Sequence, residues 1–126
     1  MNKAIICDLD GTLVTNPKWD GCFDKFYENL DYCEMVPWCK TLVKSLQNAG
    51  IKIIFVTARD VMCEKQTYDL LNKHFSGYLL YMRKAGDIRY DYIIKEEYLL
   101  EIQKEWDILF CIDDNISNCR MFAQYI

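Results

Sequence analysis

Four short, largely apolar runs recur along the chain and have the length of a β-strand. A run of this length, bounded by polar residues, is typical of a strand that is buried in a sheet. We therefore predict strands at Lys3–Cys7, Ile51–Val56, Tyr78–Met82 and Ile108–Ile112.

The segments between these runs have the apolar period of a helix. We predict helices within residues 37–50, 61–75 and 91–106. Pro37 suits the first turn of the first helix, Gly50 stops it, and Asp91 is expected to be the N-cap of the third. The positions expected to face inward are Cys39, Leu42, Val43 and Leu46 in the first helix, and Ile94, Tyr98, Leu99 and Ile102 in the third.

Strands that alternate with helices predict β-α-β units and a parallel sheet with helices on both faces. The fold class expected is therefore α/β: a single Rossmann-like three-layer domain over residues 1–126. In such sheets, ligands bind beyond the carboxyl ends of the strands.

Composition narrows the class of protein further. The chain has 126 residues, of which 52% are hydrophobic, and this suits one compact domain. Seven cysteines without a C-x-x-C pair indicate neither a disulfide framework nor a zinc site, and favour a reducing, cytoplasmic setting. We see no signal peptide and no apolar run long enough for a membrane span. The formal charge of −4 argues against coating nucleic acid by bulk charge, although local cations can still hold one phosphate.

Every predicted strand ends in polar residues, and most of them are charged. The residues concerned are Asp8 and Asp10 after the first strand, Thr57, Arg59 and Asp60 after the second, Arg83 and Lys84 after the third, and Asp113, Asp114 and Asn115 after the fourth. Because the ends of parallel strands meet at one edge, we expect one site there. A lone D-x-D is often a turn or a helix cap, but a second acidic pair favours a divalent cation. Mg²⁺ suits a few carboxylates, waters and a substrate phosphate, so the expected ligands are Asp8, Asp10, Asp113 and Asp114.

Four short motifs, in this order, resemble those of the haloacid dehalogenase-like phosphatases: "DLDGT", "VTAR", Lys95 and "IDDN". The resemblance implies that Asp8 is a nucleophile that forms an aspartyl-phosphate and that Asp10 is the acid and base. It also implies that Lys95 neutralises Asp8 and the phosphate, and that Asp114 holds Mg²⁺ while Asp113 binds it through water or pairs with Lys95. The implied contacts to the substrate come from Thr57, Gly11, Thr12, Ala58 and Arg59.

The stretch "YMRKAGDIRYDYIIKEEYL" more narrowly resembles the 3′-phosphatase domain of bacteriophage polynucleotide kinase-phosphatases. This implies that Arg83 contacts the substrate phosphate, and that Arg59 and Arg89 order the site by pairing with Asp60, Asp87 or Asp91. That domain carries an arginine after its first motif, for which Lys18 is the nearest candidate here.

The sequence also departs from that domain. It has no Gly-rich P-loop, and it stops soon after the fourth motif, so we expect a truncated C-terminal edge of the sheet. Val14–Met35 is too short for a cap domain and is expected to be a minimal flap. Its aromatic side chains would either stack a base or form local core: Trp19, Phe23, Phe26, Tyr27 and Tyr32.

These features favour a Mg²⁺-dependent phosphatase for 3′-phosphorylated DNA or RNA ends, with a kinase or ligase as a possible separate partner and no membrane contact. One alternative is a phosphatase for small molecules, nucleotides or phosphoproteins. Another is a non-catalytic module that binds phosphorylated ends, although the intact Asp8 and Asp10 argue against it.

Overall fold

The computed structural model describes residues 1–18 and 29–126. Its central sheet has four parallel strands in the order β5-β4-β1-β6, as the apolar runs predicted. These strands are β1 (Asn2–Cys7), β4 (Lys52–Asp60), β5 (Leu79–Arg83) and β6 (Trp106–Ile112). β6 is an edge strand of this sheet.

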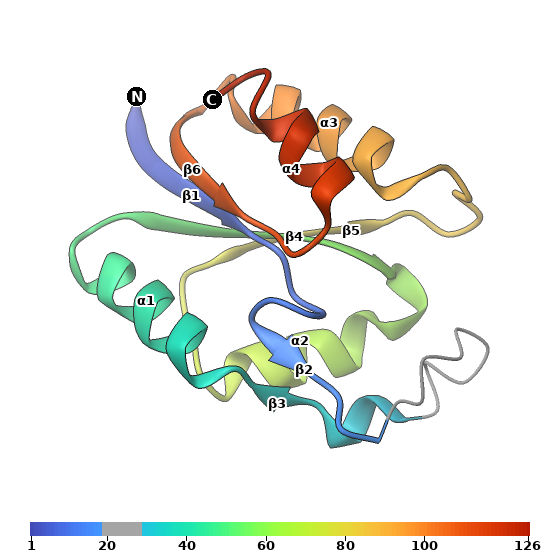
Figure 1. The fold of residues 1–126 in the computed structure, drawn as a ribbon. Coiled ribbons are helices and arrows are strands. Elements are labelled where there is room, and N and C mark those ends of the chain that lie inside the picture. The colour runs from blue at the N-terminus through green and yellow to red at the C-terminus, as the bar shows by residue number, and fades with distance from the viewer. Residues whose placement is uncertain (19–28) are drawn as a thin grey trace.

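Helices cover both faces of the sheet and complete the three layers (Figure 1). One face carries α1 (Pro37–Asn48) and α2 (Glu64–Asn72), the latter preceded by the short 3-10 helix η2 (Val61–Cys63). The other carries α3 (Asp91–Ile102) and α4 (Ile116–Phe122). None of the helices in the described ranges is long and apolar enough to cross a membrane, and the six cysteines described there are free thiols.

Successive residues of β1 and β4 pack against the two helical layers alternately, because the side chains of a strand point to opposite faces of the sheet in turn. Ile5 and Ile53 pack against the α1 and α2 side. Ile6 and Ile54 pack against α3 and α4. The two central strands therefore hold both layers together, which explains why their sequences are apolar without interruption.

Two of the predicted helix details are wrong. Leu42 is exposed rather than inward, because α1 touches the sheet through the narrower row formed by Cys39, Val43 and Leu46. Asp91 is the first residue of α3 rather than its N-cap, a position that Tyr90 takes without a side-chain cap. The Asp91 carboxylate instead accepts a hydrogen bond from Arg83.

The two ends of the predicted flap pair with each other at its base. β2 (Val14–Thr15) and β3 (Glu34–Met35) form an antiparallel ladder, and the backbone N–H of Val36 donates to the carbonyl of Leu13. Four of the expected flap aromatics, Trp19, Phe23, Phe26 and Tyr27, lie outside the described residues.

Two neighbouring leucines in α3 test this packing. Leu99 is fully buried, whereas Leu100 is 44% exposed. We expect Leu99→Ala to lower the free energy of unfolding by about 2–5 kcal/mol, since it leaves a cavity between the helix and the sheet. Leu100→Ala should change it by less than about 1 kcal/mol. Denaturant titration of both variants measures the two values, and equal losses would contradict the assignment of the buried face.

Candidate active site

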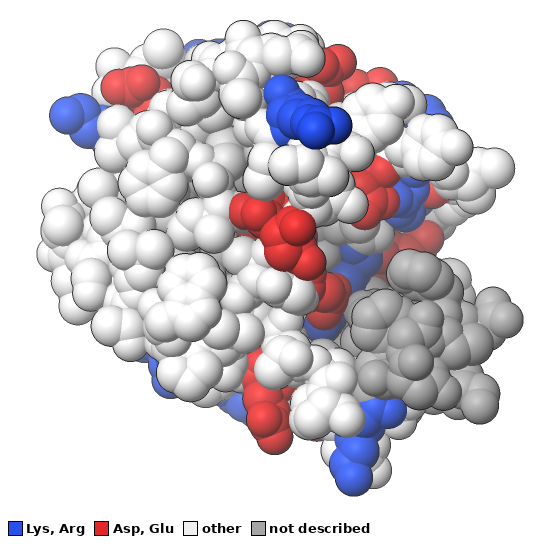
Figure 2. Space-filling model, viewed as in Figure 1, with Lys and Arg blue, Asp and Glu red and all other residues white. Residues whose placement is uncertain are grey.

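The carboxyl ends of β1, β4 and β6 surround a cavity of about 560 Å³. In Figure 2 the acidic side chains gather near the middle of this face, with basic side chains beside them. Of the predicted site residues, the cavity is lined by Asp8, Asp10, Gly11, Thr57, Ala58, Arg59, Arg83, Lys95, Asp113 and Asp114. Thr12 is buried, and Lys18 is not among the lining residues.

The buried ammonium group of Lys95 joins the two acidic motifs. Its Nζ donates to Asp8 Oδ1 at 2.9 Å and to Asp113 Oδ2 at 2.6 Å, and the Lys95 side chain is only 3% exposed. Burial alone lowers the pKa of Lys95, but the two carboxylates outweigh it and raise the pKa above its usual value. Lys95 therefore stays charged and offsets the crowding of acids, as the resemblance implied.

Asp8 lies at the end of β1 with its carboxylate almost enclosed. Burial raises its pKa to about 7; Lys95 opposes this shift, and Asp113 and Asp114 add to it. The Thr12 hydroxyl lies 3.1 Å from Asp8 Oδ2 and 3.3 Å from Asp114 Oδ1, so it can donate to either carboxylate. Without further positive charge, Asp8 is thus only partly ionised at neutral pH.

Three carboxylates form a group that suits a divalent cation. Ligand oxygens of Asp8, Asp113 and Asp114 all lie within 4.8 Å of one another. Gly11 has a φ of +85°, and a Cβ at this position would lie 2.3 Å from Asp114 Oδ2. The turn after β1 therefore needs glycine both for its conformation and to make room for the Asp114 carboxylate.

The donor set fits Mg²⁺, which prefers oxygen ligands and keeps several waters. A second observation agrees. The side-chain oxygen of Asn118 is buried and has no hydrogen-bond partner among the described residues. Its amide donates to Asp113 Oδ2, so the oxygen is fixed beside the acidic group. A water bound to the cation would supply the missing donor.

Asp10 is set apart from this group. Its two carboxylate oxygens each accept a 2.8 Å hydrogen bond from Arg59, through Nε and Nη2. The Arg59 side chain is almost fully buried, and its Nη1 also donates to the hydroxyl of Thr67. Arg59 was expected to pair with Asp60, Asp87 or Asp91, and the structure corrects this to Asp10. The Asp10 carboxylate lies outside the three-carboxylate group, so the structure does not support its expected role as a metal ligand.

Arg83 was expected to contact the substrate phosphate, but its guanidinium group already makes hydrogen bonds to the protein. Its guanidinium donates to the backbone carbonyls of Ala58, Asp87 and Arg89 and to the carboxylate of Asp91. It therefore ties the end of β4 to the loop before α3 while still forming part of the cavity wall. Arg89 pairs with Asp87, as expected, and also with Glu97.

Other residues that were predicted to bind the substrate also make contacts within the protein. The backbone N–H of Gly11 donates to the carbonyl of Val14. The Thr57 hydroxyl accepts a hydrogen bond from the backbone N–H of Arg59, and its own proton is left for a ligand. The ammonium group of Lys18 lies 5.6 Å from the centre of the Tyr32 ring.

Sequence reasoning missed Asn118, Thr67 and Cys33. Asn118 binds Asp113, whereas Thr67 and Cys33 hold Arg59 in place behind Asp10. Asn118 lies three residues after Asn115, the N-cap of α4, so its place in the first turn of a helix that follows the acidic pair was a usable signal. No feature of the sequence near Thr67 or Cys33 indicated that these residues contact Arg59.

Fold and site together define a domain of the haloacid dehalogenase-like phosphatase superfamily. Residues 2–125 match the family "Polynucleotide kinase PNKP phosphatase domain", and the chain belongs to this family.

Longer proteins contain a region similar to this chain. A "Putative bifunctional polynucleotide kinase/RNA ligase" of Autographa californica nuclear polyhedrosis virus is 30% identical in an alignment that covers 95% of this chain and 18% of that protein. A chain in "Structure of the Pnkp1/Rnl/Hen1 RNA repair complex" has a TM-score of 0.85 at 31% identity, and covers 98% of this chain and 39% of its own length. A chain in "Structure of Pnkp1/Rnl/Hen1 complex" has a TM-score of 0.87 at 30% identity, covering 98% of this chain and 42% of that one. The chain thus spans about a fifth of its viral relative.

A methyl group at Gly11 tests the packing against Asp114. We expect Gly11→Ala to weaken Mg²⁺ binding about tenfold or more, because the new Cβ displaces a carboxylate of the site. Gly50→Ala is the matched control, since Gly50 has nearly the same φ, +87°, with nothing within 4 Å. Isothermal titration of both variants with Mg²⁺ gives the comparison. Equal affinity in the two would show that Asp114 does not bind the ion.

The pKa of Asp8 predicts how Mg²⁺ binding depends on pH. A proton and a cation compete for this carboxylate, so binding should weaken as the pH falls below about 7. The dissociation constant should fall up to about tenfold between about pH 6 and pH 7, and level off above about pH 8. Titration calorimetry across this range measures it. Asp8→Asn should flatten the profile, and a flat wild-type profile would exclude Asp8 as a ligand.

Proposed function

We propose that this chain is a Mg²⁺-dependent phosphatase that removes the 3′-phosphate from polynucleotide ends through an aspartyl-phosphate on Asp8. The observation that carries the proposal is the contact of Lys95 with both Asp8 and Asp113 inside a fold that matches the family over nearly its whole length. Small-molecule phosphatase activity remains the alternative that the substrate test separates.

In the first step, an Asp8 oxygen attacks phosphorus, and the bond between phosphorus and the sugar 3′ oxygen breaks. Asp10 supplies the proton that this leaving oxygen needs. Lys95 and the Thr57 hydroxyl hold the phosphoryl oxygens, on which negative charge accumulates. A cation held by Asp8, Asp113 and Asp114 would reduce the repulsion between the nucleophile and the phosphate.

In the second step, water attacks the phosphorus of the aspartyl-phosphate, releasing inorganic phosphate and free Asp8. Asp10 takes the proton from that water. The two hydrogen bonds from Arg59 fix the orientation of the Asp10 side chain for this proton transfer. Arg59 therefore acts on the reaction by positioning Asp10.

The substrate class and the partners follow from the relatives. One is named as a putative kinase and RNA ligase, and one solved chain comes from an RNA repair complex. Both names favour RNA ends over DNA ends, and a ligase that acts on the repaired end. A cytoplasmic setting fits such a role and the free thiols.

A substrate panel tests the proposal. The value of kcat/KM should be highest on a 3′-phosphorylated oligoribonucleotide, lower on the matching oligodeoxyribonucleotide, and at least about tenfold lower on a nucleoside 3′-monophosphate or an aryl phosphate. Chelation of Mg²⁺ should abolish turnover. A wild-type enzyme with no preference for the oligonucleotides would instead be a small-molecule phosphatase.

Replacement of the nucleophile tests the covalent route. Asp8→Asn should lower kcat more than about a hundredfold, because an amide cannot form the acyl-phosphate. Asp69→Asn is the matched control, since Asp69 is exposed on α2 and, within residues 1–18 and 29–126, forms an ion pair with Lys65 alone. Its turnover should stay near that of the wild type. Substantial activity of Asp8→Asn, with thermal unfolding confirming an intact fold, would rule out attack by Asp8.

A further inference from the structure

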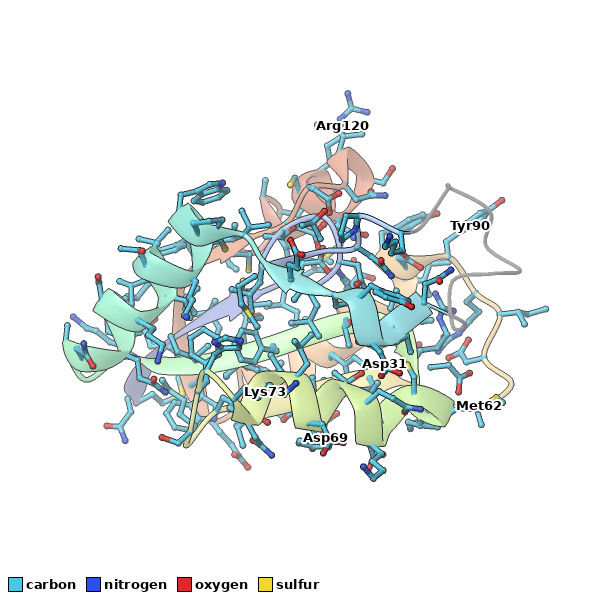
Figure 3. The ribbon with its side chains drawn as sticks, turned by 90° about the horizontal axis from the view of Figure 1, so that it is seen from below. Asp31, Met62, Asp69, Lys73, Tyr90 and Arg120 are labelled. Atoms are coloured by element: carbon cyan, nitrogen blue, oxygen red, sulfur yellow. The ribbon has the colours of Figure 1, made fainter. Side chains whose placement is uncertain are left out.

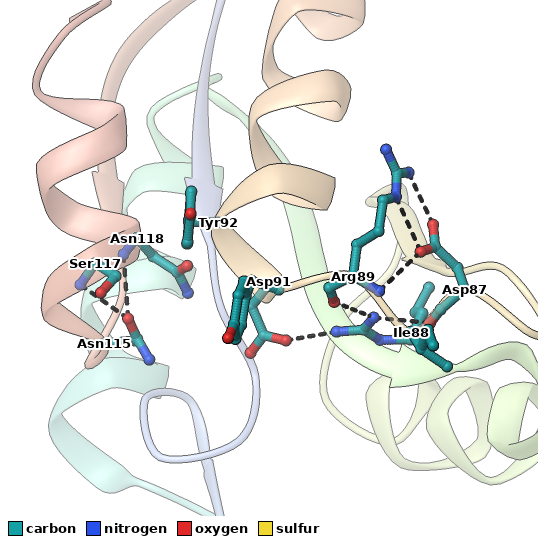
Figure 4. A pocket seen from close by; sticks show the side chains of 10 residues that line it. Asp87, Ile88, Arg89, Asp91, Tyr92, Asn115, Ser117 and Asn118 are labelled. Atoms are coloured by element: carbon teal, nitrogen blue, oxygen red, sulfur yellow. Dashed lines mark hydrogen bonds and ion pairs between the residues drawn. The ribbon is translucent and has the colours of Figure 1, made fainter.

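A second cavity, of about 810 Å³, adjoins the active site (Figure 4). It lies between the loop that precedes α3 and the start of α4. Four residues line both cavities: Arg83, Asp91, Asn115 and Asn118. The two cavities therefore lie side by side along these residues, and the second is within reach of a ligand whose phosphate occupies the first.

Two tyrosines in this second cavity form an exposed stack. The rings of Tyr90 and Tyr92 are 6.0 Å apart and inclined by only 10°, and the two residues are 74% and 41% exposed. Figure 3 shows the Tyr90 side chain extending outward from the edge of the molecule. Ile88, on the same loop, is 95% exposed. Tyr90 is the N-cap residue of α3 but gives the helix no side-chain cap.

The charges in this cavity are already paired. Arg83 is bound by Asp91, and Arg89 is bound by Asp87 and Glu97. Asp87 is firmly ionised, because its hydrogen bonds with Arg89 lower its pKa to about 2. A second phosphate would meet no uncompensated cation among these side chains, so the cavity favours a neutral part of a ligand.

The polar groups that remain suit the edge of a base. The side-chain oxygen of Asn115 accepts from the backbone N–H groups of Ser117 and Asn118. The Asn115 side-chain nitrogen and the Ser117 hydroxyl have no hydrogen-bond partner within residues 1–18 and 29–126. A flat aromatic face beside such groups fits a heteroaromatic ring with hydrogen-bonding edges better than an apolar peptide.

We propose that Tyr90 and Tyr92 form a stacking platform for a nucleobase at the phosphorylated 3′ end of the polynucleotide, and that this platform gives the enzyme its preference for such ends over phosphate esters that carry no base. The inference rests on the proposed function, since it needs a substrate that carries a base next to the scissile phosphate. Stacking on tyrosine tolerates any base, because every base has a π-face, so the platform recognises an end without selecting a sequence.

Kinetics on two substrates test the platform. For Tyr90→Ala and Tyr92→Ala, the ratio of kcat/KM on a 3′-phosphorylated oligoribonucleotide to kcat/KM on an aryl phosphate should fall about tenfold or more. Tyr90→Phe and Tyr92→Phe should retain most of the ratio, because the ring remains. Trp38→Ala is the matched control, since Trp38 is a 61% exposed aromatic residue on α1 that lines neither cavity. Its ratio should match that of the wild type.

A binding measurement separates affinity from turnover. In the Asp8→Asn background, the same tyrosine variants should weaken binding of the fluorescent 3′-phosphorylated oligoribonucleotide about tenfold or more, as measured by anisotropy. If both alanine variants keep the wild-type ratio and affinity, the platform is wrong while the phosphatase stands. A loss on Trp19→Ala alone would place the stacking in the flap and overturn the inference too. If the wild type does not act on oligonucleotides, the proposed function itself fails.

Discussion

The site depends on one buried contact, in which the ammonium group of Lys95 lies between the carboxylates of Asp8 and Asp113. Like charges this close would repel strongly in a poorly solvated cavity, and a buried charge that loses its partner costs about 3–5 kcal/mol. Lys95 offsets only part of the acidity, because Asp114 adds a further carboxylate within 4.8 Å. The protein therefore leaves an excess of negative charge around Asp8, the proposed nucleophile, and a bound cation would offset it.

The order of the strands is what makes this contact possible. β1 and β6 are neighbours and carry Asp8 and Asp113 at their carboxyl ends, while α3 brings Lys95 back over the same edge. β4 is the other neighbour of β1 and delivers Arg59 to Asp10. Successive apolar side chains of the central strands point to opposite faces of the sheet and hold the two helical layers in place. This arrangement also determines which charged groups come together. A change of register in β1 would exchange the layers and separate the acids at once.

The parts of the site that follow from strand order were predictable from the sequence, because polar residues directly after four apolar runs must gather at one edge. The contact of Lys95 with Asp8 was expected from the family resemblance, which also left pairing with Lys95 as one of two alternatives for Asp113. The partners of the arginines were not predictable. A guanidinium reaches far from its Cα, so its position in the chain does not show that Arg59 turns to Asp10. Nor does it show that Arg83 is held by loop carbonyls that come close only in the folded chain.

Arg83 and Asp91 also show how recognition of an end can be built into so small a domain. Their ion pair belongs to the wall of the charged cavity and to that of the neutral, aromatic one. In the proposed reaction the contacts of the charged cavity are to phosphoryl oxygens, so this cavity would accept any phosphate monoester. Discrimination must come from whatever adjoins that phosphate, and Tyr90 and Tyr92 stand at this position on the proposed path of the polymer. The loop before α3 then connects the phosphate site to the site that selects the substrate. Arg83 holds this loop against β4 through hydrogen bonds to both.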